Sequence, residues 1–442
     1  MTLIALAIEE PSPRGIAAAI ARLISLGDLA PGDRLPTVRE LAAELGVSPA
    51  TVSHAWQTLS RAGLVVSRGR SGTFVRSAPR EWLPLRYRSL DDTTTARLDL
   101  SRGTPDPELL PSLAPALSRV THTADAPSYQ QKPDIPQLHD LLRATWPTPV
   151  ESITVTNGAL DAIDRVLAAL ARFGDRVVVE NPTFPPFLDL LEHYGLDPVP
   201  VALDEFGMLP DAFASALAAG PSLVLLQPRA HNPTGISMSP ERAERLGAVL
   251  RRTRAADRAI VIEDDHSGAV TSAADVTLAS VVPERVLHVR SFSKTHGPDL
   301  RIGALGGPRE LVDRVVAHRM LGAGWTSRMT QAILFDLLTE PDSVAQVSRA
   351  RTAYTERQQL FAAAMAAQGI AIAAGDGLNA WLPVRNERAA TVQLAGDGLR
   401  VAPGSPFQLG AAVPHVRVTV GMVRSDVESI AESLAAAAQR LA

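Results

Sequence analysis

The chain has no cysteine, only two lysines, and no long apolar run among its 442 residues. The lack of cysteine excludes disulfide bonds and thiolate metal sites. No apolar run approaches the roughly 18 residues that a membrane-spanning helix needs. The opening MTLIALAI reaches Glu9 and Glu10 too early for a signal peptide. We therefore expect a cytoplasmic protein with no membrane partner.

The scarcity of lysine makes Lys294 unusual, because arginine supplies almost all of the 43 basic residues. Only Lys132 shares its type. Lysine can lose its proton and, when buried with a lowered pKa, attack carbonyl compounds to form Schiff bases. A solvated surface lysine is the commoner interpretation. Lys294, however, follows an apolar stretch and lies in SFSKTHGPDLRIG beside two serines and Arg301.

Length and composition indicate a folded protein with more than one domain. Hydrophobic residues make up 46% of the chain and charged residues 20%, which is typical of globular proteins. The net charge of -4 does not by itself indicate a nucleic-acid partner.

The composition and hydrophobic pattern of the chain change at three places. Residues 1–76 contain short helical patterns, and 77–97 read as a linker with prolines, charges and a threonine run. In 98–442, short runs such as DRVVVE, SLVLLQP and AIVIEDD alternate with helical segments, which predicts an α/β domain with a mostly parallel sheet. From about residue 345 to 442 the pattern favours a smaller α+β subdomain.

Residues 35–65 predict two helices joined by a turn at Gly46. Ser48 can cap the second helix and Pro49 suits its first position. A stripe with helical spacing predicts the buried side of that helix: Val52, Ala55, Trp56 and Leu59.

The same spacing leaves Thr51, Ser53 and His54 facing outward, where a recognition helix meets base edges. LVVSRGRSGTFV then predicts a β-hairpin with Arg68 and Arg70 at its tip, where cations suit DNA phosphates. The alternative is an ordinary small helical domain with solvated arginines.

The string GDRLPTVRELAAELGVSPATVSHAWQTLSRAGLVVSRGRSGTFV resembles the winged helix-turn-helix of GntR-type regulators. The resemblance implies binding to double-stranded DNA. Together with the helix pattern it indicates these contact residues: Arg39, Ser48, Thr51, His54, Arg68, Arg70, Gly72 and Thr73. Pro49 stands where the family usually has an arginine, so one guanine contact is expected to be missing.

Three further stretches favour a phosphate-bearing cofactor near Lys294. Ser291, Ser293 and Arg301 supply phosphate donors, and SITVTNGALDAID predicts a strand, a turn and a helix start that can face an anion. AIVIEDDHSG ends a strand in three acids, which alone could be a solvated rim, a metal site or the partner of a protonated ring nitrogen. In HNPTG, Asn232 offers an amide. The combination indicates pyridoxal 5'-phosphate (PLP).

From about Asp99 onward the chain resembles fold-type I, class I and II aminotransferases. The resemblance implies that Lys294 forms the Schiff base with PLP, that Asp264 faces the ring nitrogen and that Asn232 bonds the ring oxygen. It also implies the remaining contacts to the phosphate and the ring face: Gly158, Ala159, Ser291, Ser293, Arg301 and Phe184. No metal is expected.

Three other positions correspond to functional residues of these aminotransferases, and the chain differs from the family's pattern at or near two of them. Tyr129 matches a tyrosine that reaches the phosphate in the partner subunit, but the glycine expected shortly after it is absent. Arg417 matches the arginine that binds a substrate carboxylate. His266 stands where a tyrosine usually bonds the ring oxygen.

A winged helix ahead of such a domain resembles the MocR branch of GntR regulators. That resemblance implies a homodimer that binds an operator with two half-sites and senses an amine, an amino acid or PLP itself through Lys294. The alternative is an active aminotransferase that acts on an amino acid and a 2-keto acid.

Overall fold

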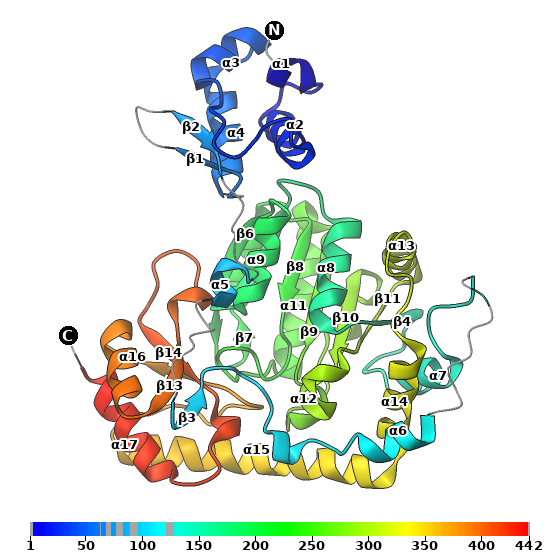
Figure 1. Cartoon of the computed structure of the whole chain (residues 1–442), viewed down its shortest axis with the longest axis vertical. Helices are drawn as coiled ribbons and strands as arrows, with labels where there is room; N and C mark the ends of the chain where they lie inside the picture. Colours follow the sequence, from blue (N-terminus) through cyan, green and yellow to red (C-terminus); the bar gives the residue numbers. More distant parts are fainter. Residues whose placement is uncertain are drawn as a thin grey trace. The chain divides into compact units, whose positions relative to one another are not determined.

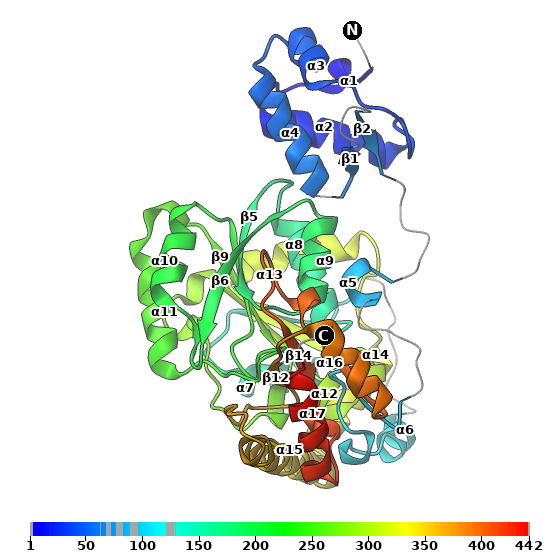
Figure 2. The ribbon, with the colours of Figure 1, turned by 90° about the vertical axis from the view of Figure 1, so that its left-hand side faces the viewer.

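The computed structural model describes residues 3–61, 63–67, 72–76, 83–88, 96–120, 128 and 130–440. Arg68, Arg70 and Tyr129 therefore lie outside the described residues. The chain separates into two compact units, one centred on the N-terminal residues and one on the larger C-terminal part, and each is described by itself (Figures 1 and 2).

The described part of residues 3–76 contains four helices and a two-stranded hairpin: α1 (Leu3–Ala7), α2 (Pro13–Leu26), α3 (Val38–Leu45), α4 (Pro49–Arg61), β1 (Val65–Ser67) and β2 (Thr73–Val75). A short helix, α5 (Leu85–Arg88), follows within the predicted linker. The hairpin is antiparallel. Thr37 and Glu40 form a reciprocal capping box at the start of α3, and Gly46 ends that helix at φ 67°. As predicted, α4 begins at Pro49, and the Ser48 hydroxyl accepts the Thr51 N–H at 3.1 Å.

Apolar side chains of these helices form the core of the N-terminal unit. Val52, Ala55 and Leu59 are fully buried and Trp56 is 7% exposed, so the predicted stripe of α4 is confirmed. These side chains pack with Ile16 and the rest of one cluster. α4 is therefore held along its inner side, and its outer side remains available.

The large unit contains an eight-stranded sheet in the order β4-β11-β10-β9-β8-β5-β6-β7. Its strands are β4 (Ser152–Thr156), β5 (Arg176–Asn181), β6 (Asp197–Asp204), β7 (Gly207–Met208), β8 (Leu223–Leu226), β9 (Ile260–Asp265), β10 (Val286–Ser291) and β11 (Gly303–Gly307). β8, β9 and β10 are parallel, whereas β11 runs antiparallel to both β10 and β4. Residues 292–302 between β10 and β11 are shorter than a parallel crossover requires, so the sheet is mixed.

Helices pack on this sheet and beside it: α6 (Ala114–Val120), α7 (Pro136–Ala144), α8 (Ala159–Leu170), α9 (Pro185–His193), α10 (Pro210–Ala218), α11 (Pro240–Arg252), α12 (Ser293–His296), α13 (Arg309–Met320) and α14 (Arg328–Thr339). Val224 and Val261 of the sheet, for example, share a core cluster with Phe213 of α10 and Leu246 of α11. The inner strands β5, β8, β9 and β10 are buried along nearly their whole length, which explains their lack of polar alternation.

A second sheet, with the order β12-β14-β13-β3, belongs to the smaller subdomain. Its elements are β3 (Leu98–Leu100), β12 (Ala380–Pro383), β13 (Leu399–Pro403) and β14 (His415–Val418), with α15 (Pro341–Ala367), α16 (Glu387–Gly396) and α17 (Val427–Ala438) against them. β3 pairs in parallel with β13, so a segment far away in sequence completes the subdomain. No described helix is long and apolar enough to cross a membrane.

Candidate functional sites

The candidate residues of the large unit gather at the carboxyl ends of β8, β9 and β10. This edge is where open α/β sheets bind ligands, because the loops that follow parallel strands converge there. Asp264 lies near the end of β9, and Lys294 lies on α12, directly after β10. β9 and β10 are adjacent and in parallel register, with Asp264 opposite Val289.

Lys294 is held in a partly buried position. Its Nζ donates a hydrogen bond to the carbonyl oxygen of Gly103. Burial and, to a smaller extent, the charge of Arg417 lower the pKa of the ammonium group to about 8, against the opposing effect of Asp264. A lysine with such a pKa has a substantial free-amine fraction near neutral pH, which is what attack on an aldehyde requires.

Asp264 has one occupied and one unpartnered carboxylate oxygen. Its Oδ2 accepts a hydrogen bond from Gln227 Nε2 at 2.8 Å, and its Oδ1 is buried with no partner among the described residues. Burial raises the pKa of Asp264 to about 7, against the lowering effect of the Gln227 hydrogen bond. A buried oxygen without a donor suits a protonated ring nitrogen, so this carboxylate fits a pyridine cofactor.

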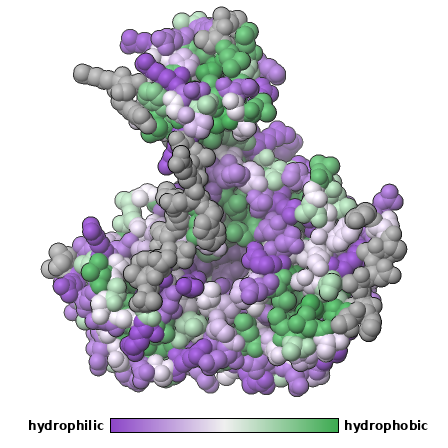
Figure 3. All heavy atoms as spheres, in the orientation of Figure 1, coloured by the Kyte–Doolittle hydropathy of each residue, from purple (hydrophilic) through white to green (hydrophobic). Residues whose placement is uncertain are grey.

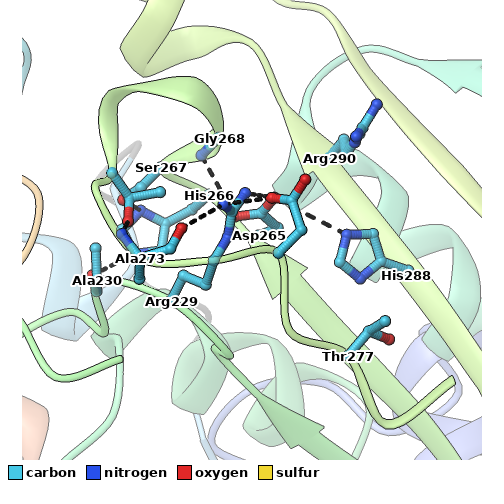
Figure 4. A network of polar contacts seen from close by, with 12 residues as sticks. Arg229, Ala230, Asp265, His266, Ser267, Gly268, Ala273, Thr277, His288 and Arg290 are labelled. Atoms are coloured by element: carbon cyan, nitrogen blue, oxygen red, sulfur yellow. Dashed lines mark hydrogen bonds and ion pairs between the residues drawn. The ribbon is translucent and has the colours of Figure 1, made fainter. Parts of the chain in front are cut away.

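The other two acids of the EDD run point to the opposite side of the strand. Asp265 forms a buried ion pair with Arg229, at 2.6 Å between Oδ2 and Nη2, and Glu263 Oε2 lies 2.8 Å from His288 Nδ1. Figure 4 shows Arg229 and Asp265 facing one another, with His288 nearby. The acids are buried rather than a solvated rim. The described residues contain no cluster of three or more histidine and carboxylate side chains placed to hold a metal ion.

Asn232 and Arg417 meet in the same site although 185 positions separate them in the sequence. Arg417 Nη1 donates to Asn232 Oδ1 at 3.1 Å, and Arg417 Nη2 donates to the Ser101 carbonyl oxygen. Arg417 is 1% exposed, and burial lowers the pKa of its guanidinium to about 10. A guanidinium bonded only to neutral oxygens can accommodate a ligand carboxylate.

Two of the predicted phosphate residues, Gly158 and Ala159, lie at the start of α8. Gly158 has φ 103°, and Ala159 is the first residue of the helix. Arg301 Nη2 donates to the Asn157 carbonyl oxygen at 3.3 Å, and a Cβ added to Gly158 would lie 3.2 Å from the same nitrogen. Backbone N–H groups and the helix dipole therefore face the same place as a guanidinium, as an anion site requires.

Strand register brings the serines to this anion site. Ser291 is opposite Gly303, and Gly303 is opposite Thr156 on the next strand, two residues before Gly158. Ser291 is 6% exposed, and its hydroxyl accepts the Ser293 N–H at 3.3 Å. Any side chain at Gly303 would lie within 3.0 Å of the Gly158–Ala159 backbone, which explains the glycine there.

His266 and Phe184 have different surroundings. His266 Nε2 lies 3.0 Å from the Ala230 carbonyl oxygen, and its Nδ1 lies 3.1 Å from Ser267 Oγ. The carbonyl can only accept, so the Nε2 nitrogen carries the proton. Burial, followed by the Lys294 charge, lowers the pKa of His266 to about 4, so the ring is neutral. Phe184 is half-buried just before α9.

Two buried residues of this site were not identified from the sequence. Gln227 follows β8 and bonds Asp264, and Glu180 on β5 accepts the Gln227 N–H at 2.8 Å. The available signal was the position of Gln227 as the first polar residue after an apolar strand. The sequence does not show that β5 and β8 are neighbours in the sheet, so nothing in it placed Glu180 in this site.

The N-terminal unit presents its candidate DNA contacts on α3, α4 and the hairpin. Arg39 and His54 are exposed, and Thr51 is half-buried in the first turn of α4. Gly72 has φ 107° and precedes Thr73, the first residue of β2. Residues 1–76 contain eight arginines and six acids, so this part is positive although the whole chain has a net charge of -4.

Comparisons with known families match both parts of the chain. Residues 13–75 match the bacterial regulatory proteins of the gntR family, and residues 96–434 match aminotransferase class I and II. The second match covers most of the chain.

Curated relatives extend over the whole length. The vitamin B6 salvage pathway transcriptional repressor PtsJ of Salmonella typhimurium is 36% identical over 427 residues, which cover 95% of this chain and 97% of PtsJ. The HTH-type transcriptional regulator TauR of Rhodobacter capsulatus is 30% identical, over 86% of each chain.

Solved structures share the fold of the large unit. LysN, an alpha-aminoadipate aminotransferase from Thermus thermophilus, has a TM-score of 0.69 at 22% identity over 77% of this chain and 92% of its own. An archaeal alanine:glyoxylate aminotransferase also has a TM-score of 0.69, at 21% identity over 81% of this chain and 98% of its own.

Proposed function

The chain belongs to the MocR-type branch of the GntR transcriptional regulators, in which an aminotransferase class I and II domain follows the DNA-binding region. From this membership we propose that PLP controls the binding of the chain to DNA. The DNA-binding role lies in the winged helix-turn-helix. The regulatory role lies in the site at the carboxyl ends of the sheet.

The residues of that site suit each part of PLP. Bound there, PLP would supply an aldehyde that reacts with amines and an electron-withdrawing ring. Lys294 would bind the aldehyde carbon as a Schiff base, and Asp264 would accept a hydrogen bond from the protonated ring nitrogen. Asn232 would donate to the ring oxygen, Phe184 would cover the ring, and the start of α8 with Ser291, Ser293 and Arg301 would hold the phosphate.

The observation that carries this proposal is the buried Asp264 Oδ1, which has no partner among the described residues. A buried carboxylate oxygen without a donor costs free energy that a charged donor recovers. The charge of Asp264 also raises the pKa of Lys294, so the two groups lie close together in one site. Asp265 is not an equivalent candidate, because Arg229 already neutralises it.

PLP itself is the effector that we propose first. The relative that matches 95% of this chain is named as a repressor of vitamin B6 salvage, and PLP is the active form of that vitamin. We therefore propose that this chain also controls a vitamin B6 gene and that bound PLP changes its affinity for the operator.

An amino acid is the second candidate, and Arg417 is the observation that favours it. This buried guanidinium has no carboxylate within ion-pair distance among the described residues, and its Nε has no partner there. A carboxylate of an amino acid would neutralise it. An active aminotransferase stays the alternative function on the same evidence.

We also propose a homodimer that binds two half-sites. Apolar side chains gather on the surface over α6 and α14, where Leu117 is 51% and Met329 is 53% exposed (Figure 3). Large apolar patches on a folded domain mark interaction surfaces. Such a dimer would carry two winged helices, one for each half-site.

Lysine scarcity makes the cofactor test simple. The full chain is incubated with PLP and reduced with borohydride, and peptides are analysed by mass spectrometry. We expect the pyridoxyl adduct on Lys294, its loss in Lys294→Ala and its retention in Lys132→Ala. An adduct on Lys132 alone would contradict the proposal.

Operator binding is tested with the same variants. We expect PLP to change the affinity of the wild-type chain and of Lys132→Ala for operator DNA, and to leave Lys294→Ala unaffected. A separate reaction with single amino acids and a 2-keto acid tests the alternative function. Sustained product formation would identify an enzyme, and binding without turnover would identify a sensor.

A further inference from the structure

Gln227 uses each of its polar groups on a different partner. Its Nε2 donates to Asp264 Oδ2, its Oε1 accepts the Asn232 N–H, and its own N–H donates to Glu180 Oε2, each at 2.8 Å. Gln227 is only 3% exposed. The backbone donor of Asn232 requires an acceptor, so the amide oxygen must face Asn232 and the amide nitrogen must face Asp264.

Strand register explains why one side chain can reach both partners. β8 and β9 are parallel with Leu226 opposite Glu263, so the next residue, Gln227, lies beside Asp264. The chain then turns and returns at Asn232. A side chain at position 227 is therefore between the two residues that would contact two different atoms of the cofactor ring.

The donor from Gln227 also determines which oxygen of Asp264 remains available. With Oδ2 occupied, Oδ1 is the oxygen left without a partner. Loss of the Gln227 donor would leave both oxygens without a partner. The carboxyl group could then rotate, and its pKa would rise further, because this hydrogen bond is the main effect that opposes burial.

The groups behind Gln227 do not add a competing charge. Burial raises the pKa of Glu180 well above its usual range, and the charge of Asp264 raises it further, so both effects favour the neutral form of Glu180. His231 Nε2 lies 3.4 Å from Glu180 Oε2, and burial lowers the pKa of His231 to about 3, so its ring is neutral. Asp264 is therefore the group of this set that bears charge toward the ring.

We infer that Gln227 is a positioning residue for the cofactor: it aims Asp264 Oδ1 at the ring nitrogen and fixes the loop that carries Asn232. The inference rests on the proposed function, because it concerns the PLP ring. Gln227 itself lies behind these two residues and acts through them.

A double-mutant cycle tests this role in the full chain. The variants are Gln227→Met, Asp264→Asn and the double variant, and the readouts are PLP affinity, the absorbance spectrum of bound PLP and the melting temperature without PLP. We expect Gln227→Met to weaken PLP binding about tenfold, as loss of one hydrogen bond to a charged group predicts. In the Asp264→Asn background the same change should cost less, because only its effect on the Asn232 loop remains.

Gln331 provides the matched control. It is fully buried, and like Gln227 its Oε1 accepts a backbone N–H at 2.8 Å, from Ile135, while its Nε2 donates to two carbonyl oxygens. Gln331→Met should lower the melting temperature and leave PLP affinity and the spectrum unchanged. An equal loss of PLP affinity in both glutamine variants would overturn the inference.

A second variant protects the test against misfolding. Gln227→Glu differs little in size and keeps an oxygen for the Asn232 N–H, and at a pH high enough to ionise the new carboxyl group it cannot donate to Asp264. We expect weaker PLP binding in the wild-type background and no further loss in the Asp264→Asn background, where the new amide can donate instead.

Different results would refute the proposed function and the inference about Gln227. A wild-type chain that does not attach PLP would refute the proposed function. A wild-type chain that attaches PLP, together with Gln227 variants whose losses are the same in both backgrounds, would refute the inference alone.

Discussion

The reactivity of Lys294 toward PLP should follow a pH midpoint that the structure places far below that of an ordinary lysine. Burial and the charge of Arg417 lower the pKa from 10.5 to about 8. At pH 7 about one amine in ten is then unprotonated, against about one in 3,000 at the ordinary value. Attachment of PLP at neutral pH should therefore be about 300 times faster than the ordinary pKa would allow.

The sign follows from the direction of the shift. A lowered pKa means that the reactive free amine is reached at lower pH, so the rate should rise up to about pH 8 and then level off. Arg417→Gln removes a positive charge and should move the midpoint upward. Asp264→Asn removes the charge that holds the proton on Lys294 and should move it downward.

Rapid mixing of the full chain with PLP, followed by absorbance from about pH 6 to about pH 10, measures this midpoint. The same titration with Nα-acetyl-lysine in solution corrects for the ionisation of PLP itself. A midpoint near 10 in the wild-type chain, or two charge variants that shift it in the same direction, would refute the reasoning.

Three further predictions concern other parts of the chain. Asp264→Asn should weaken PLP binding at least tenfold with little effect on the melting temperature. Asp265→Asn removes the charge that neutralises the buried Arg229 and should destabilise the large domain by about 3 kcal/mol. A PLP titration measures the first effect and calorimetry the second. Leu59→Ala should destabilise the winged helix by about 2–5 kcal/mol, because the side chain is fully buried, and in a calorimetric melt only the transition of that unit should move. Thr51→Ala and His54→Ala should change which DNA sequences a selection experiment recovers, and an unchanged preference would show that these side chains do not read bases.

Much of the architecture could be predicted because it depends on local signals. The helices of the winged helix-turn-helix have caps and an apolar stripe within a few residues of one another, as at Ser48 and Val52–Leu59. The inner strands of the large sheet appear as apolar runs because both of their sides are buried. Lys294 and Asp264 could be proposed as partners from their residue types and from the resemblance to a family.

Other features depend on strand order and chain direction, which no local pattern encodes. The antiparallel course of β11, the addition of β3 to the C-terminal sheet and the place of Gln227 beside Asp264 all follow from which strands are neighbours. Pairing partners can lie hundreds of residues apart, so only the folded chain determines them.

The sequence by itself therefore determined the two-part organisation, the helix-turn-helix and the residue types of the cofactor site. The tertiary structure decided which of two adjacent aspartates is left with an unpartnered oxygen. Alternate side chains of a strand point to opposite sides, and Arg229 lies on the side of Asp265 while Gln227 lies on the side of Asp264. That difference in surroundings, rather than in residue type, distinguishes a neutralised structural acid from one that can hold a cofactor.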